Sequence, residues 1–331
     1  MTGPLALTLG DPAGVGPEIT AKAWLALRDQ GPVFVAVGDG DLLAAQGVPI
    51  SRVETLAEGA RSFRDSLPVL DLPLTALVEP GRPSSAHAPM IIRWIETATD
   101  LALSGEASGV VTAPIAKAPL YEAGFRFPGH TEFLADLTAH APMAGERGPV
   151  MMLASGDLRT VLVTIHEPYA KAPSLLTTGR IVHTALVTAE ALRRDFGVER
   201  PRLAVAGLNP HAGESGQIGR EEIDIIAPAV AALRERGIDA FGPRPADTLF
   251  HPEARQTYDA AVCMYHDQAL IPVKMLDFWG GVNVTLGLPI VRVSPDHGTG
   301  FDVAGKGVAR ADSLIAALRT AAAIAERRQG A

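Results

Sequence analysis

Short runs of strand-forming residues alternate with longer amphipathic, alanine-rich segments along this chain, and this alternation limits the possible folds more than any other feature. In the first half, three apolar runs are each followed by a segment with helical periodicity: 5–10 by 17–29, 33–38 by 40–46, and 109–114 by 116–123. Strands separated by helices in this way form β-α-β units with parallel strands. The pattern therefore predicts an α/β protein with mostly parallel sheets.

The second half continues the alternation. Further apolar runs lie at 149–155, 160–166, 202–211, 260–266, 282–287 and 290–294, and helical segments lie near 173–195, 221–236 and 312–327. A single hydrophobic core seldom grows beyond about 250–300 residues, so a chain of 331 residues is expected to form two lobes. No linker marks the boundary. We expect a terminal α/β lobe from 1–128 plus 290–331 and a central α/β lobe from 129–289.

Composition and charge exclude several classes of partner. The chain is 47% hydrophobic and 20% charged, which suits a globular enzyme. Its 29 basic and 37 acidic residues give a net charge of -8 without a basic run, so neither nucleic acid nor an anionic membrane is an expected partner. Cys263 is the single cysteine, and no uninterrupted apolar stretch reaches the ~18 residues of a membrane span. A cytoplasmic protein is expected.

Three of the strand-like runs lead to a histidine: His166 in VLVTIHE, His211 in LNPHAGE and His266 in MYHDQ. Ligand sites in doubly wound sheets lie outside the carboxyl ends of strands. Neutral imidazole is a common metal ligand, and three ligands with one open position describe a catalytic site. We predict that the trio surrounds one divalent metal ion, although any one of these histidines alone is more typical of an ordinary strand end. Glu167 and Asp267 would orient the imidazoles or remain solvated.

Two groups of residues are suited to binding an anion. In FPGHTEFLAD, His130 and Thr131 open a helical segment, where free backbone N–H groups and the helix dipole favour phosphate. Thr131 as a simple N-cap is the equal alternative. Lys274, Asn283 and Arg292 lie near three consecutive strand-like runs and would add an ammonium group, an amide and a guanidinium fork.

Two glycine-rich loops carry weaker signals. LGDPAGVGPEI (9–19) follows the first strand but matches neither the dinucleotide fingerprint nor the P-loop pattern, so an ordinary tight turn is expected. DHGTGFDVAGKG (296–307) precedes the final helix and would bring backbone N–H groups to a dinucleotide.

Taken in order, these motifs resemble those of the PdxA family, the 4-hydroxythreonine-4-phosphate dehydrogenases of vitamin B6 biosynthesis. The matching strings are TLGDPAGVGPEI, PGHTEFLA, GLNPHAGE, PADTLF, MYHDQ, GVNVTLGLP and DHGTGFDVAGKG. The two glycine-rich loops are also similar to loops of isocitrate and isopropylmalate dehydrogenases. The resemblance implies a two-lobed α/β/α fold with mostly parallel sheets, the active site in the interlobe cleft, and no Rossmann fingerprint.

The resemblance also assigns roles to individual residues. It implies a homodimer in which the three histidines hold one zinc, magnesium or cobalt ion per active site at the subunit interface. His130, Thr131, Lys274, Asn283 and Arg292 match substrate contacts, and His297, Gly298, Thr299 and Asp302 are assigned to NAD or NADP. Segments 51–90 and 112–120 follow the family loosely and carry no matched ligand.

The reaction implied by the family is the oxidation of 4-phosphohydroxy-L-threonine to 2-amino-3-oxo-4-(phosphooxy)butanoate, which decarboxylates to 3-amino-2-oxopropyl phosphate. Asp247 is the candidate for proton removal or metal support. Three alternatives remain open. The substrate could be a related sugar acid such as threonate or erythronate 4-phosphate, or the site could belong to a metallohydrolase or phosphatase, because three histidines with an open position also activate water. An acyltransferase is disfavoured by the histidine trio.

Overall fold

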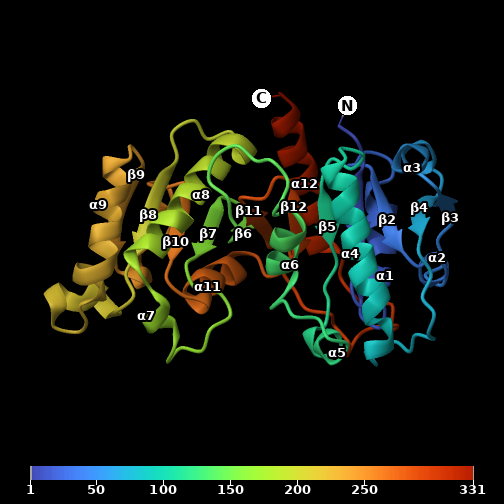
Figure 1. Cartoon of the computed structure of the whole chain (residues 1–331), viewed down its shortest axis with the longest axis horizontal. Coiled ribbons are helices and arrows are strands. Elements are labelled where there is room, and N and C mark those ends of the chain that lie inside the picture. The colour runs from blue at the N-terminus through green and yellow to red at the C-terminus, as the bar shows by residue number, and fades with distance from the viewer. Residues whose placement is uncertain (1, 331) are drawn as a thin grey trace. The chain divides into compact units, whose positions relative to one another are not determined.

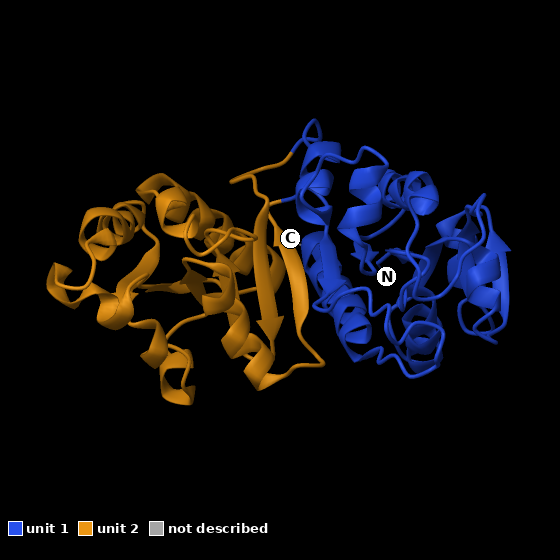
Figure 2. Cartoon of the chain, turned by 90° about the horizontal axis from the view of Figure 1, so that it is seen from below, with its two compact units in different colours: residues 1–142, 288–330 blue, residues 143–287, 331 orange. Residues whose placement is uncertain are grey.

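The computed structural model describes residues 2–330, which form two compact α/β units (Figure 2). Unit 1 consists of 1–142 and 288–330, and unit 2 of 143–287. Both described ends of the chain therefore belong to unit 1. Residues 129–142, which include His130 and Thr131, also lie in unit 1, whereas the sequence-based division assigns them to the central lobe.

The sheet of unit 1 contains six strands in the order β3-β4-β2-β1-β5-β12, and all its neighbouring pairs are parallel. Their bounds are β1 Leu5–Thr8, β2 Phe34–Gly38, β3 Ile50–Val53, β4 Leu67–Asp71, β5 Val110–Thr112 and β12 Arg292–Pro295. Because the strands are parallel, their carboxyl ends meet at one edge. The loops that follow β1, β5 and β12 share this edge.

Helices cover this sheet and supply its core. They are α1 Gly16–Leu27, α2 Gly40–Ala44, α3 Leu56–Ser62, η1 Ser85–His87, α4 Ala88–Leu103, α5 Lys117–Glu122, α6 His130–Leu137 and α12 Asp312–Gly330. Helix α4 packs against β1, β2 and β5, and α12 against β12, β5 and β1 (Figure 1). Trp24 and Trp94 are fully buried, and their indole N–H groups donate to the carbonyl oxygens of Phe63 and Leu72 over 2.7 and 2.9 Å. Each buried ring contributes apolar area without leaving an unsatisfied donor.

Unit 2 has a mixed sheet in the order β11-β6-β7-β10-β8-β9. Its strands are β6 Val150–Ser155, β7 Leu158–Leu162, β8 Arg202–Ala206, β9 Asp239–Arg244, β10 Ala260–Cys263 and β11 Val282–Leu286. Only β6 runs antiparallel to its two neighbours, β11 and β7, among the described strands of this unit. The carboxyl ends of β7, β10 and β8 therefore lie together.

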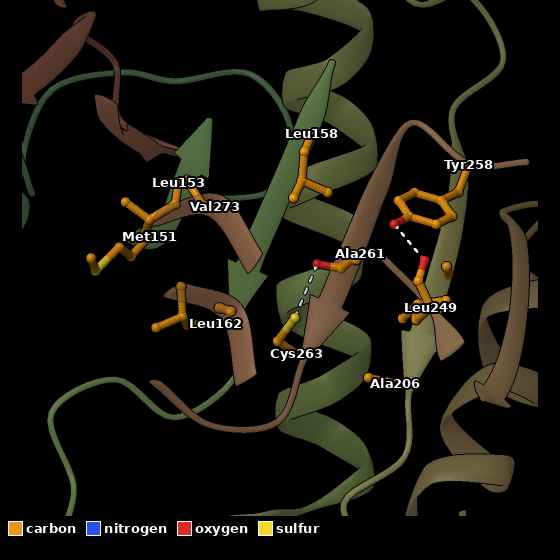
Figure 3. Packing of buried hydrophobic residues seen from close by; sticks show 12 residues of the cluster. Met151, Leu153, Leu158, Leu162, Ala206, Leu249, Tyr258, Ala261, Cys263 and Val273 are labelled. Carbon is orange, nitrogen blue, oxygen red and sulfur yellow. Dashed lines mark hydrogen bonds between the residues drawn. The ribbon is translucent and has the colours of Figure 1, made fainter. Parts of the chain in front are cut away.

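The helices of unit 2 are α7 Ala172–Leu175, α8 Thr178–Phe196, η2 Pro210–Gly216, η3 Glu222–Ile226, α9 Ala227–Glu235, η4 Ala246–Thr248, α10 Pro252–Arg255 and α11 His266–Leu276. Buried side chains from β6, β7, β10 and α11 form a core cluster that includes Leu158, Cys263 and Val273 (Figure 3). Burial raises the pKa of the Cys263 thiol. The Tyr258 hydroxyl donates to the carbonyl oxygen of Leu249 over 3.0 Å and closes one side of the cluster.

The α/β class and the mostly parallel strands predicted from the sequence are confirmed. Three differences concern detail. Elements that lie in segments where none was predicted are β3, β4, β9, α3, α4 and α10. Helix α11 was not predicted because His266 was treated as a strand end. The helical segment near 173–195 is divided into α7 and α8. Among residues 2–330, no helix is both long and apolar enough to span a membrane.

Candidate active site

Arg292 is the first residue of β12, where its backbone lies beside Val110 of β5 in the sheet of unit 1. Its Nη2 atom donates to the Thr112 hydroxyl over 2.8 Å, and the two residues are 3% and 0% exposed. Burial lowers the pKa of Arg292 to about 10, an effect that the nearby carboxylate of Glu132 partly offsets. The guanidinium remains charged at neutral pH, so unit 1 contains a positive charge fixed in a buried position.

His130 begins α6, directly after Gly129. Burial is the main cause of its pKa lying well below the usual value, and the charges of Arg292 and Lys117 lower it further. The ring is therefore neutral at pH 7. Its Nε2 atom is enclosed and has no hydrogen-bond partner within residues 2–330. An enclosed ring nitrogen beside two cations is suited to a hydrogen bond with an anionic ligand, and Thr131 follows in the first turn of the same helix.

The two glycine-rich loops of unit 1 are in contact. The backbone N–H of Val15 donates to the carbonyl oxygen of Thr299 over 2.9 Å, and a Cβ at Gly14 would lie only 2.7 Å from that oxygen. His297, Gly298 and Asp302 are exposed, and a Cβ at Gly298 would meet no described atom within 4 Å. The first loop, expected to be an ordinary turn, therefore supports the second, whose outer face is open.

In unit 2, the structure brings His166 and His266 together. Their ring centroids are 5.6 Å apart with 40° between the planes. The two rings line a pocket of about 290 Å³ together with Ile165, Glu167, Pro168, Tyr169, Tyr265 and Asp267. Glu167 pairs with Lys171 over 2.9 Å.

Asp267 orients the imidazole of His266. The Nδ1–H of His266 donates to Asp267 Oδ1 over 2.7 Å, and the Tyr169 hydroxyl donates to Oδ2 over 2.6 Å. The bond from Tyr169, followed by the bond from His266, lowers the pKa of Asp267. Since Nδ1 carries the proton in this arrangement, the lone pair of His266 is at Nε2, which is the tautomer that a metal ligand requires.

His211 lies in η2, five residues after β8 ends, and the structure does not join it to the other two histidines within one chain. Across the described residues, no three His, Cys, Asp or Glu side chains form a group that could hold a metal ion. His211, Ala212, Glu214 and Ser215 all have positive φ, at 52°, 50°, 43° and 54°. Such backbone is unfavourable for residues with a side chain, so neighbouring groups must hold the turn in place.

Glu222 stabilises this turn through hydrogen bonds to its backbone. Its side chain is 3% exposed and accepts hydrogen bonds from the backbone N–H groups of Leu208 and Asn209, both over 2.7 Å, and from the Asn209 amide over 2.9 Å. A Cβ at Gly213 would lie 2.6 Å from Glu222 Oε2, so the turn has no room for a side chain there. No sequence motif indicated this role for Glu222.

The remaining predicted site residues of unit 2 lie on separate elements. Asp247 is exposed in η4, which contacts the turn η2 that carries His211. Lys274 lies on α11 with its ammonium nitrogen 5.2 Å from the ring centre of Phe278. Asn283 is on β11, and its enclosed Oδ1 has no hydrogen-bond partner in the described chain. His130, Thr131 and Arg292 belong to unit 1, whereas Lys274 and Asn283 belong to unit 2.

Two α/β units, with His166 and His266 brought to one pocket just after the ends of β7 and β10, are typical of an α/β enzyme. Comparison with known proteins gives its family. Residues 31–321 match the model of the family described as pyridoxal phosphate biosynthetic protein PdxA. The chain is 70% identical over 327 residues to 4-hydroxythreonine-4-phosphate dehydrogenase of Caulobacter vibrioides, with 98% of each chain covered.

Solved structures agree with this match. A crystal structure of 4-hydroxythreonine-4-phosphate dehydrogenase from Klebsiella pneumoniae is similar with a TM-score of 0.84 and 40% identity, covering 98% of each chain. A terephthalate 1,2-cis-dihydrodiol dehydrogenase from Burkholderia xenovorans has a TM-score of 0.64 and 29% identity over 98% of each chain. The chain therefore belongs to the PdxA family and is an oxidoreductase, as its sequence motifs predicted.

Proposed function

We propose that this protein oxidises 4-phosphohydroxy-L-threonine with NAD or NADP and a divalent metal ion. The product, 2-amino-3-oxo-4-(phosphooxy)butanoate, then loses carbon dioxide to give 3-amino-2-oxopropyl phosphate. The observation that carries the proposal is the buried Arg292, fixed by Thr112 beside the enclosed ring of His130, in a chain that is 70% identical to a relative named for this substrate.

The substrate phosphate binds at the anchor formed by His130, Thr131 and Arg292, with Lys274 and Asn283 as further contacts. A buried guanidinium and a neutral imidazole offer N–H donors to phosphate oxygens, and both groups have already lost their hydration in the folded chain. Holding the phosphate fixes the distance from the anchor to the carbon that is oxidised. Such positioning lowers the barrier by confining the reacting atoms to a productive geometry.

His166, His211 and His266 are proposed to hold the metal ion. The donor set fits: His166 and His266 already face one pocket, and Asp267 fixes the tautomer of His266. A divalent ion, when bound, polarises the substrate hydroxyl and the carbonyl that replaces it, which also favours decarboxylation. Zinc, magnesium and cobalt are all candidates. Asp247, on the element that contacts the His211 turn, is the proposed proton acceptor or metal support.

The nicotinamide cofactor is placed at His297, Gly298, Thr299 and Asp302. The outer face of this loop is open at Gly298, and Thr299 is fixed by its bond to Val15. Backbone N–H groups in such a loop would approach a cofactor phosphate closely.

A homodimer in the cytoplasm, with active sites at the subunit interface, completes the proposal. Unit 2 exposes large apolar side chains within nine residues at the end of α11: Ile271 is 63% exposed, Met275 83%, Phe278 60% and Trp279 49%. An exposed apolar patch of this kind is typical of a protein interface. A second copy of the chain is the proposed occupant, and its approach would let His211 complete a metal site that one chain leaves with two facing histidines.

The experiment is a coupled assay with 4-phosphohydroxy-L-threonine, NAD or NADP, and zinc, magnesium or cobalt, following absorbance at 340 nm. Appearance of reduced cofactor only when substrate and metal are both present supports the proposal. A relative with 29% identity is named for a different substrate, a terephthalate dihydrodiol. Substrate choice therefore differs among similar proteins, so threonate and erythronate 4-phosphate should be compared in parallel. Higher kcat/KM with either sugar acid would reassign the substrate, and phosphate release without reduced cofactor would indicate a hydrolase.

A further inference from the structure

The loop between β5 and α5 places a lysine beside the phosphate anchor of unit 1. Lys117 is the first residue of α5, and a Cβ at Gly129, the residue before His130, would lie 3.7 Å from the Cε atom of Lys117. The charge of Lys117 acts on the His130 ring together with that of Arg292. Lys117 therefore lies next to the residue that precedes His130.

Asp11, in the loop that follows the neighbouring strand β1, fixes this loop. It is 2% exposed, and its carboxylate accepts hydrogen bonds from the backbone N–H groups of Ala13 and of Ala116, the residue before Lys117. The N–H of Asp11 in turn donates to the carbonyl oxygen of Pro114 over 2.8 Å. The backbone that carries Lys117 is thus tied at two points to Asp11, in the loop that follows β1. The Lys117 side chain is exposed and has no ion-pair partner in the part of the chain that the structure describes.

The charges of Arg292, Glu132 and His130 together do not balance the charge of a bound phosphate ester. Arg292 contributes one positive charge and Glu132, which acts on it, one negative charge, whereas His130 is neutral. A phosphate ester carries about -1.5 to -2 charges at pH 7. Among these groups of unit 1, Lys117 is therefore the one that raises the net charge around His130 above zero; Lys274, the other proposed cationic contact, belongs to unit 2.

We propose that Lys117 is a further substrate-binding residue, whose ammonium group contacts the phosphate held by His130 and Arg292. This inference rests on the proposed function, because it adds a further basic contact to the same anchor. The lysine would supply a point charge on a flexible stem, which complements the rigid guanidinium fork of Arg292.

The test measures binding of inorganic phosphate to the full chain by isothermal titration calorimetry. Lys117→Met should weaken binding by about tenfold or more, as expected for loss of a charged hydrogen bond, and Lys117→Arg should remain within about threefold of wild type. Arg64→Met, which removes an exposed charge elsewhere in unit 1, should bind phosphate like wild type. In steady-state assays, Lys117→Met should raise KM for the phosphorylated substrate and leave KM for the nicotinamide cofactor unchanged.

The outcomes separate this inference from the proposed function. If Arg292→Met loses phosphate binding and Lys117→Met binds like wild type, Lys117 is not a contact, but the anchor stands. If neither wild type nor any variant binds phosphate, the anchor and the lysine contact are both wrong. Should Lys117→Met fail to fold, Lys117→Gln provides the same comparison with a polar side chain, and wild-type affinity in that variant would overturn the inference.

Discussion

Arg292 Nη2 and Thr112 Oγ1 are joined by a hydrogen bond of 2.8 Å between two adjacent strands of unit 1, and neither residue is accessible to more than 3%. This bond is made by two groups of the protein itself. It therefore holds the guanidinium in one orientation, so the fold sets the geometry of the phosphate anchor.

Thr112→Val tests this relationship because valine has nearly the same shape but lacks the acceptor. We expect KM for the phosphorylated substrate to rise about three- to tenfold, in keeping with the ~1 kcal/mol of a typical hydrogen bond, while KM for the nicotinamide cofactor stays constant. Thr99→Val is the control, since Thr99 is also buried in unit 1 and donates to the carbonyl oxygen of Ile95. Equal changes in both Michaelis constants for Thr112→Val would mean that the bond serves stability alone.

His130 should make the stability of the protein depend on pH. Its pKa in the folded chain lies well below the unfolded value of 6.5, mainly because of burial. Between these two values the unfolded chain binds more protons, so the contribution of His130 is complete above about pH 6.5 and is lost as the pH falls towards the folded pKa. For this single group, the free energy of unfolding changes by at most about 1.4 kcal/mol per pH unit.

His130→Asn should reduce this acid sensitivity. Urea unfolding at several pH values between 5 and 7.5 would give the free energy of unfolding for both proteins, and the difference between them should shrink as the pH falls. His140, which is exposed in the same unit, provides a control substitution to asparagine. Parallel pH curves for wild type and His130→Asn would show that the ring is not held neutral.

Much of the fold could be predicted because buried parallel strands need continuous apolar runs. The runs at 33–38 and 260–266 correspond to β2 and β10, which are fully buried. Helix α11 was missed because it begins only three residues after β10 and contains Pro272, a residue that is unfavourable inside a helix. Strand β3 is only half-buried, and its residues ISRV give no comparable signal.

The site was less predictable because its parts depend on tertiary contacts. The positions of His166 and His266 in the sequence do not show how far apart they lie. Only the fold of unit 2 brings their ring centroids to within 5.6 Å of each other. Lys117 lies in TAPIAKAPL, which carries no recognisable ligand motif. Only the fold shows that it lies near Gly129 and that Asp11 holds its loop. Nor does the sequence reveal the left-handed turn around His211, which Glu222 stabilises from 11 residues further along the chain.

His211→Ala tests the third proposed metal ligand. His211 is exposed, so the thermal unfolding temperature should change little, whereas metal-dependent turnover should be lost and affinity for zinc or cobalt should fall about tenfold or more. Calorimetric titration of metal into the metal-free protein measures this directly. His251→Ala removes another exposed histidine of unit 2, one that pairs with Glu253, and should retain metal affinity. Full activity of His211→Ala in metal-stripped buffer would contradict the proposed site.

The last prediction concerns the exposed apolar patch at the end of α11, which we propose is covered by a second chain in the dimer. Met275→Asp combined with Phe278→Asp places two charges among side chains that are 83% and 60% exposed, so the folded monomer should tolerate them. Burial of each original side chain in a dimer would contribute about 1.5–3 kcal/mol, and the variant should therefore dissociate at least about 100-fold more readily.

Sedimentation equilibrium should show a dimer for wild type and a monomer for the double variant at micromolar concentration. Leu77→Asp, at a fully exposed position of unit 1, should remain dimeric. Because the proposed metal site draws His211 from the approach of a second chain, the double variant should also lose metal affinity, although none of its own histidines has changed. A monomeric variant that binds metal as tightly as wild type would place all three ligands within one chain.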